Sequence, residues 1–306
     1  MDVWVVFGQM VLIFLMISIG YGMTKIKILS QEGIKQISWL VLNITNPCLV
    51  LSSAFEGKSE ISHKEVFVMF LASGFVYLLL ALLGKFTGKL VGGKLEDYNA
   101  YRAITAFANV GFIGIPLVAA VFGSQYLLYV AIFNIWFGLT FYTYGMFLLK
   151  SENEKGGFAW KKFLNAGTVS SFFAIFLFLL GVKLPSICMD FLAYVGKPTT
   201  FLSMLVLGYS IGQKMLKELL PRMENFKFLL WKMLFLPILL AIISGVFMKG
   251  YPQIRNILVV MVAMPAANMP LMVMQEQGRE SKVLTTNIIM TTLMALVTIP
   301  IVVAFL

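Results

Sequence analysis

Two apolar segments of this chain are interrupted near their centres by Gly, Asn and Pro, at matching places in its two halves. The first reads Asn109-Val-Gly111-Phe-Ile-Gly114-Ile-Pro116, and the second reads Pro265-Ala-Ala-Asn268-Met-Pro270. A proline inside a helix removes one backbone donor and frees the carbonyl four residues before it. Inside a bilayer, such freed groups are tolerated only where protein buries them or where they line a watered cavity. The paired breaks therefore predict a membrane protein with a polar site between its helices.

The composition agrees with this class and excludes others. The chain is 59% hydrophobic and only 12% charged, with a mean hydropathy of +0.89, whereas soluble domains carry about twice that charged fraction. The net charge of +10 would suggest nucleic acid in a soluble protein. Here the basic residues lie mostly between apolar stretches, where they set orientation, so no nucleic-acid partner is expected. The two cysteines, Cys48 and Cys188, suggest no disulfide framework, and no metal or cofactor site is predicted.

Hydropathy predicts an all-α membrane protein with ten transmembrane helices. The polar stretch 150–162 divides five spans from five, so we expect a first five-helix repeat over 1–149, a cytoplasmic linker over 150–162 and a second five-helix repeat over 163–306. The predicted spans are Val3–Met23, Ile34–Phe55, Lys64–Gly84, Ala100–Phe122, Gln125–Leu149, Phe163–Val182, Pro185–Gly212, Phe226–Met248, Ile254–Met274 and Val283–Leu306.

The Lys and Arg distribution predicts the orientation. Eighteen of the 24 basic residues, Lys232 among them, are assigned to the loops that follow the odd-numbered spans. Those loops should be cytoplasmic, which places both termini outside a multi-pass protein of the cell membrane. Because each half has an odd number of spans, the second half should insert upside down relative to the first, as an inverted repeat.

The breaks predict a substrate-binding site where spans 4 and 9 cross. We expect the second half-helices to begin near Pro116 and Pro270, so that their N-termini approach each other near the midplane. Each N-terminus presents unpaired N–H groups and about half a positive charge, which together favour an anion, above all a carboxylate. The alternative is that the breaks only kink the helices for packing. The candidate binding residues here are Asn109, Gly111, Gly114, Pro116, Pro265, Asn268 and Pro270.

A second pair of interruptions lies in spans 2 and 7, at Asn46-Pro47 and Lys197-Pro198. Asn46 and Pro47 are candidates for the cavity lining or for hydrogen bonds between helices. Lys197 lies within a predicted span, where a charge costs about 2.5–3.5 kcal/mol on insertion scales. Three interpretations stay open. Lys197 is a counter-ion for a substrate carboxylate, or it pairs with a carboxylate such as Asp190. Alternatively, span 7 begins near Pro198 and Lys197 lies at the membrane interface.

The motif around Pro116, the stretch from Met264 to Pro270, and the Gln-Glu-Gln-Gly that ends at Gly278 together resemble the auxin efflux carrier family. That family includes plant auxin carriers and bacterial permeases for malonate and other organic acids. The resemblance covers the whole membrane portion, and the short stretch 150–162 fits a compact prokaryotic member. It implies crossed broken helices at spans 4 and 9, a transport domain that moves against a scaffold, and often a homodimer.

The leading hypothesis is a secondary transporter that moves small organic anions by alternating access. A channel, or a carrier for a neutral small solute, is the alternative. The chain lacks a Walker-type nucleotide motif, and with one histidine and no cluster of His, Cys and carboxylate it has no parts for a hydrolytic enzyme. Coupling to protons, coupling to sodium and uncoupled flow all stay open.

Overall fold

The computed structural model describes residues 3–55, 61–149, 166–182, 184–213, 222–276, 279 and 281–306. In these ranges the backbone forms α-helices, short 3-10 and π-helical turns, and one isolated β-bridge, so the predicted all-α class is confirmed. The elements of the first half are α1 (Val3–Lys25), α2 (Gln31–Leu40), η1 (Val41–Thr45), α3 (Asn46–Phe55), α4 (His63–Val91), η2 (Leu95–Asp97), α5 (Tyr98–Ala106), η3 (Val110–Gly114), α6 (Ile115–Val121), η4 (Ser124–Tyr126), α7 (Leu127–Thr140), η5 (Phe141–Gly145) and α8 (Met146–Leu149). Those of the second half are α10 (Ala166–Leu179), α11 (Ser186–Gly196), α12 (Thr199–Gly212), α13 (Met223–Leu230), η7 (Trp231–Phe235), α14 (Leu236–Phe247), α15 (Pro252–Ala263), α16 (Met269–Glu276) and α17 (Lys282–Ala304).

Six helical stretches in the described ranges are long and apolar enough to cross a membrane. They are Phe7–Lys25, His63–Val91, Ser124–Leu149, Ser186–Gly212, Met223–Phe247 and Lys282–Ala304. The other four predicted spans contain shorter or interrupted helices, namely α2 to α3, α5 to α6, α10, and α15 to α16. The predicted linker 150–162 lies outside the described residues.

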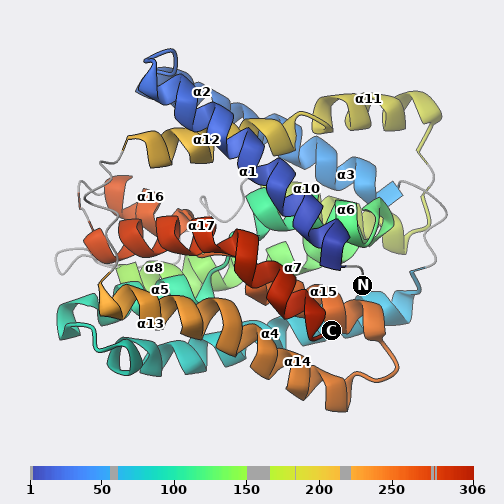
Figure 1. Ribbon diagram of the computed structural model, residues 1–306. Helices are drawn as coiled ribbons and strands as arrows, with labels where there is room; N and C mark the ends of the chain where they lie inside the picture. The colour runs from blue at the N-terminus through green and yellow to red at the C-terminus, as the bar shows by residue number, and fades with distance from the viewer. Residues whose placement is uncertain are drawn as a thin grey trace.

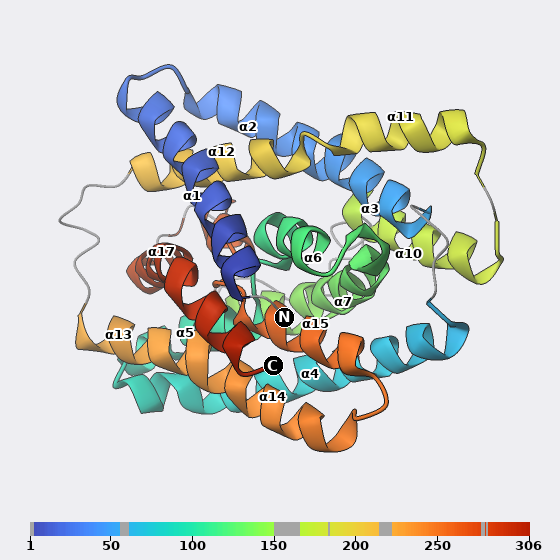
Figure 2. The same ribbon diagram turned by 45° about the vertical axis from the view of Figure 1, so that its right-hand side comes forward.

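The helices pack in two groups, which are visible in both orientations (Figure 1, Figure 2). In the first group α1 packs along α12, and α3 packs against α11. In the second group α4 packs against α5 and α7, α14 against α15, and α13 against α17. The two groups meet where α1 contacts α17 and α6, where α3 contacts α7, and where α12 contacts η3. We call them the α1/α12 group and the α4/α15 group.

Glycines allow the closest helix contacts of the α1/α12 group. A Cβ added at Gly208 would collide with the carbonyl oxygen of Ile17, and one added at Gly20 would collide with that of Leu205. Such small residues let helix backbones approach closely in a membrane, where no hydrophobic force drives helices together. Close backbone packing, more than side-chain volume, therefore fixes α1 against α12.

Three of the π-helical turns end two residues before a proline: η1 before Pro47, η3 before Pro116 and η7 before Pro237. The proline ring clashes with the carbonyl four residues back in a regular helix. In these turns the backbone N–H groups bond five residues back instead, as Asn46 does to Val41 and Leu236 does to Trp231. The wider turn accommodates each proline without an interruption of the helix.

Candidate substrate site at the paired helix breaks

The two interrupted segments meet in the interior of the α4/α15 group. Ala108 and Ala266 form an antiparallel β-bridge. The N–H of Asn109 donates to the carbonyl of Pro265 at 2.7 Å, and the N–H of Ala267 donates to that of Phe107 at 3.0 Å. Extended backbone at each break thus finds partners in the other break, which satisfies groups that would be costly to bury unpaired. Of the candidates here, Asn109, Gly114, Pro265 and Pro270 are buried, whereas Gly111, Pro116 and Asn268 are half-buried.

The second half-helix of the first segment begins earlier than the sequence predicts. It starts at Val110 in η3 and continues through α6, six residues before the predicted start at Pro116. This prediction was wrong because the wide turn of η3 accepts Pro116 inside the helix. The second half-helix of the other segment starts at Met269, one residue before the predicted position.

The corrected boundaries place two asparagines at equivalent positions. Asn109 directly precedes Val110, and Asn268 directly precedes Met269, so each is the residue before a half-helix. Asparagine is among the preferred residues at that position because its side chain can accept from N–H groups of the first turn. Each half-helix N-terminus in the core therefore carries an amide side chain beside it.

A side chain from α17 completes the bonding of the second break. The hydroxyl oxygen of Thr291 accepts from the N–H of Ala266 at 3.1 Å and donates to the carbonyl of Asn287 at 2.7 Å. Asn287 is fully buried and accepts from the side-chain amide of Asn225 at 3.1 Å. This chain of bonds ties the break to α17 and α13.

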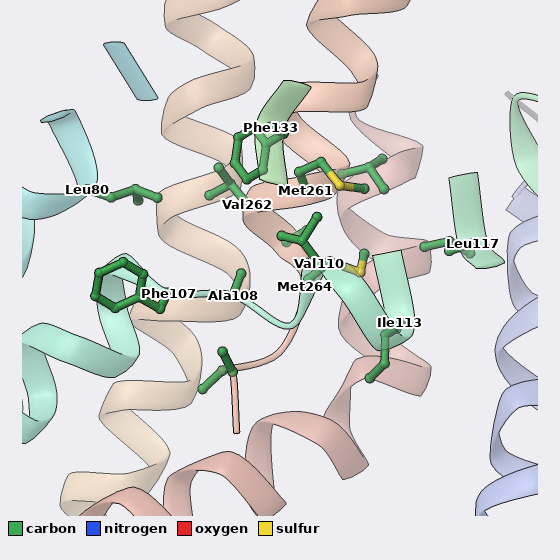
Figure 3. Close-up of a cluster of buried hydrophobic side chains, with 14 of the residues drawn as sticks. Leu80, Phe107, Ala108, Val110, Ile113, Leu117, Phe133, Met261, Val262 and Met264 are labelled. Carbon is green, nitrogen blue, oxygen red and sulfur yellow. The ribbon is translucent and has the colours of Figure 1, made fainter. Parts of the chain in front are cut away.

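Apolar side chains surround the bridged segments. Figure 3 shows Phe107, Ala108 and Val110 along the first segment and Met264 at the start of the second. Leu80 of α4, Phe133 of α7 and Met261 of α15 lie in the same cluster. A Cβ added at Gly114 would lie 3.2 Å from the sulfur of Met261, whereas one at Gly111 would meet nothing within 4 Å. Open space therefore adjoins the backbone near the start of the half-helix that begins at Val110.

Sequence analysis missed Lys232, which it assigned to a cytoplasmic loop. The residue lies in η7 and is fully buried. Its ammonium donates to the carbonyls of Thr105 at 3.2 Å and Val262 at 3.4 Å, which lie at the ends of α5 and α15. The signal that could have found it was the single lysine inside the apolar run from Phe228 to Met248.

The breaks of predicted spans 2 and 7 also lie against each other. A Cβ added at Gly196, just before Lys197-Pro198, would lie 2.8 Å from the Cα of Leu49, just after Asn46-Pro47. Pro47 is buried. In the described part of the chain, the Thr45 and Thr199 hydroxyls and the side-chain amide oxygen (Oδ1) of Asn46 have no hydrogen-bond partner.

These three unpartnered oxygens lie in η1, α3 and α12. Among these elements, α12 contacts both η1 and η3, the turn that begins at Val110.

Lys197 is exposed, unlike the buried backbone of the paired breaks. Its ammonium lies 5.3 Å from the ring centroid of Tyr194, a cation–π arrangement on the junction between α11 and α12. The interpretation that Lys197 lies at the membrane interface stays a prediction.

Apolar spans, paired helix breaks and buried polar groups beside them define the class of this chain as a multi-pass membrane transport protein. The model of the family described as membrane transport protein matches residues 5–159 and matches again at residues 157–303. The chain therefore belongs to this family, the auxin efflux carrier family that the sequence motifs resemble.

Two relatives from methanogens are similar along nearly the whole chain. An uncharacterised transporter of Methanothermobacter thermautotrophicus is 24% identical over 303 residues, which cover 94% of each chain. An uncharacterised transporter of Methanocaldococcus jannaschii is 25% identical over 300 residues, with the same 94% coverage of both. Both relatives are described as transporters, which supports the assignment of this chain as a transport protein and not an enzyme.

Proposed function

We propose that this chain is a secondary transporter that moves small organic anions across the cell membrane by alternating access. The observation that carries the proposal is the pair of half-helices that begin at Val110 and Met269, each preceded by an asparagine. Their N-termini supply N–H donors and partial positive charge without a mobile side chain, a suitable arrangement for a carboxylate.

The substrate would bind between the paired breaks and the α1/α12 group. Open space beside Gly111 gives a ligand access to the half-helix backbone. The Thr45 and Thr199 hydroxyls lack partners among the described residues and can donate to a bound carboxylate. The Asn46 amide oxygen only accepts, so a donor elsewhere on the solute would supply its partner. Pro47 follows the wide turn of η1, and Pro198 lies between α11 and α12, so both prolines adjoin these positions.

Alternating access would move the α4/α15 group against the α1/α12 group, in an elevator-like step. Bonds across the breaks and from Asn225, Thr291 and Lys232 tie the α4/α15 group together. We infer a fold of ten spans in two inverted five-helix repeats, over 1–149 and 163–306, with both termini outside. The two family matches, one in each half, support the repeat.

The test is a binding titration of purified protein with a small carboxylate and with its neutral amide analogue. We expect the carboxylate to bind and the amide to bind at least about tenfold more weakly, since hydrogen bonds to charged groups are the stronger ones. Equal affinity would contradict the anion proposal and favour a neutral solute. Saturable uptake with counter-exchange in proteoliposomes would distinguish a carrier from a channel.

A further inference from the structure

Lys232 is a buried lysine, and no acidic side chain among the described residues forms an ion pair with it. The lysine has no exposed surface. A charge at such depth is costly unless polar groups compensate it. Its two partners, the carbonyls of Thr105 and Val262, must therefore account for its stability in this position.

Both carbonyls are available because the breaks redirect their usual donors. In a continuous helix the carbonyl of Thr105 would accept from the N–H of Asn109, and that of Val262 from the N–H of Ala266. The N–H of Asn109 instead donates to Pro265, and that of Ala266 to Thr291. Lys232 replaces both missing donors at once.

The same two carbonyls mark the negative pole of the site. Thr105 is the second-to-last residue of α5, and Val262 is the second-to-last residue of α15. Each helix C-terminus carries about half a negative charge, and two of them together match one ammonium. In transporters with broken helices, half-helix C-terminal ends coordinate the coupling cation. Lys232 occupies that kind of position with a covalently attached cation.

We propose that the ammonium of Lys232 is a tethered cation that fills the cation site between the C-termini of α5 and α15, so that anion transport by this chain requires neither Na⁺ nor K⁺. Lys232 acts as a positioning residue. It holds the C-termini of α5 and α15 together and neutralises their partial negative charge. The half-helix N-termini that would face the substrate begin at Val110 and Met269. The transport part of this inference rests on the proposed function, whereas the cation site itself does not.

The experiment compares Lys232→Ala and Lys232→Met with the parent and with Lys227→Ala, an exposed lysine of the neighbouring turn. We expect Lys232→Ala to unfold at a lower temperature and to lose anion uptake by roughly tenfold or more, the scale of lost hydrogen bonds to a charged group. Methylammonium or ethylammonium should raise its unfolding temperature and restore uptake, while the same salts leave Lys227→Ala and the parent unchanged. Lys232→Met should keep the packing of the aliphatic stem, but these ions should raise neither its unfolding temperature nor its anion uptake.

Parent uptake should be equal in Na⁺, in K⁺ and in N-methylglucamine buffers. A parent that needs Na⁺ or K⁺, or a Lys232→Met variant as stable and as active as the parent, would overturn the proposal. If the parent carries no anion at all, the proposed function fails, and the stability response of Lys232→Ala to alkylammonium still decides whether the cation site exists. If Lys232→Ala does not fold without additives, growth and purification with ethylammonium must recover it, and failure to do so counts against the tethered cation.

Discussion

Asn109 donates its backbone N–H to the carbonyl of Pro265 at 2.7 Å, and this bond joins residues from opposite halves of the chain. It has two consequences for the site. The carbonyl of Thr105 loses its helical donor and becomes available to Lys232, and the asparagine itself becomes the residue before a new half-helix. One backbone bond thus links the negative and positive poles of the proposed substrate site.

The two asparagines should contribute to anion binding. We expect Asn109→Ala or Asn268→Ala to weaken carboxylate binding by roughly 1–3 kcal/mol, the usual effect of leaving buried polar groups without partners. Asn43→Ala is the control, because Asn43 is exposed and its amide donates to Trp39 of its own helix. Isothermal titration of the three variants checks this, and unchanged affinity in both site variants would remove the asparagines from the site.

Loss of the Thr291 hydroxyl should destabilise the fold more than loss of the neighbouring Thr292 hydroxyl. Thr291→Val leaves the buried N–H of Ala266 without its acceptor, so we expect a loss of about 1–3 kcal/mol of unfolding free energy. Thr292→Val is matched in chemistry and burial, but that hydroxyl donates only to the carbonyl of Ile288. Thermal unfolding in detergent compares them, and equal midpoints would contradict the bonding described for the second break.

Gly111 and Gly114 should respond differently to alanine. At Gly111 the added methyl enters open space, so we expect unchanged or slightly higher stability together with weaker anion uptake. At Gly114 it presses on the end of the Met261 side chain, which should lower stability more than uptake. Uptake and unfolding measured on the same preparations separate the two effects, and normal uptake by Gly111→Ala would place the substrate elsewhere.

Removal of the Lys197 charge should leave anion binding unchanged. The ammonium is exposed and lies over Tyr194, so Lys197→Ala removes no partner from the paired breaks. Titration with the same carboxylate checks this. A loss of affinity comparable with that of Asn109→Ala would restore Lys197 as a counter-ion for the substrate.

The orientation can be tested by labelling in intact cells. In a background with Cys48→Ser and Cys188→Ser, a cysteine introduced as Asp2→Cys or Glu60→Cys should react with an impermeant maleimide. Gly156→Cys should react only after the cells are opened, because loops rich in Lys and Arg stay in the cytoplasm. Labelling of position 156 from outside would reverse the proposed topology.

The sequence by itself determined the class, the family and the places where helices break. Apolar stretches of spanning length require helices, and proline and glycine weaken them at fixed positions, so these properties are local and can be read from the order of residues. The breaks around Asn109 and Asn268 and the motifs of the family were all visible in this way.

Only the tertiary structure decided how the breaks are satisfied. The wide π turn before Pro116 moved the start of a half-helix to Val110, and a bond between Asn109 and Pro265 replaced a helical one. Lys232 is 127 residues from Thr105 in sequence and 30 from Val262, so nothing local indicated that it bonds to both. Because a freed backbone group can be satisfied by any donor or acceptor that the fold brings near, its partner is a property of packing and not of the sequence around it.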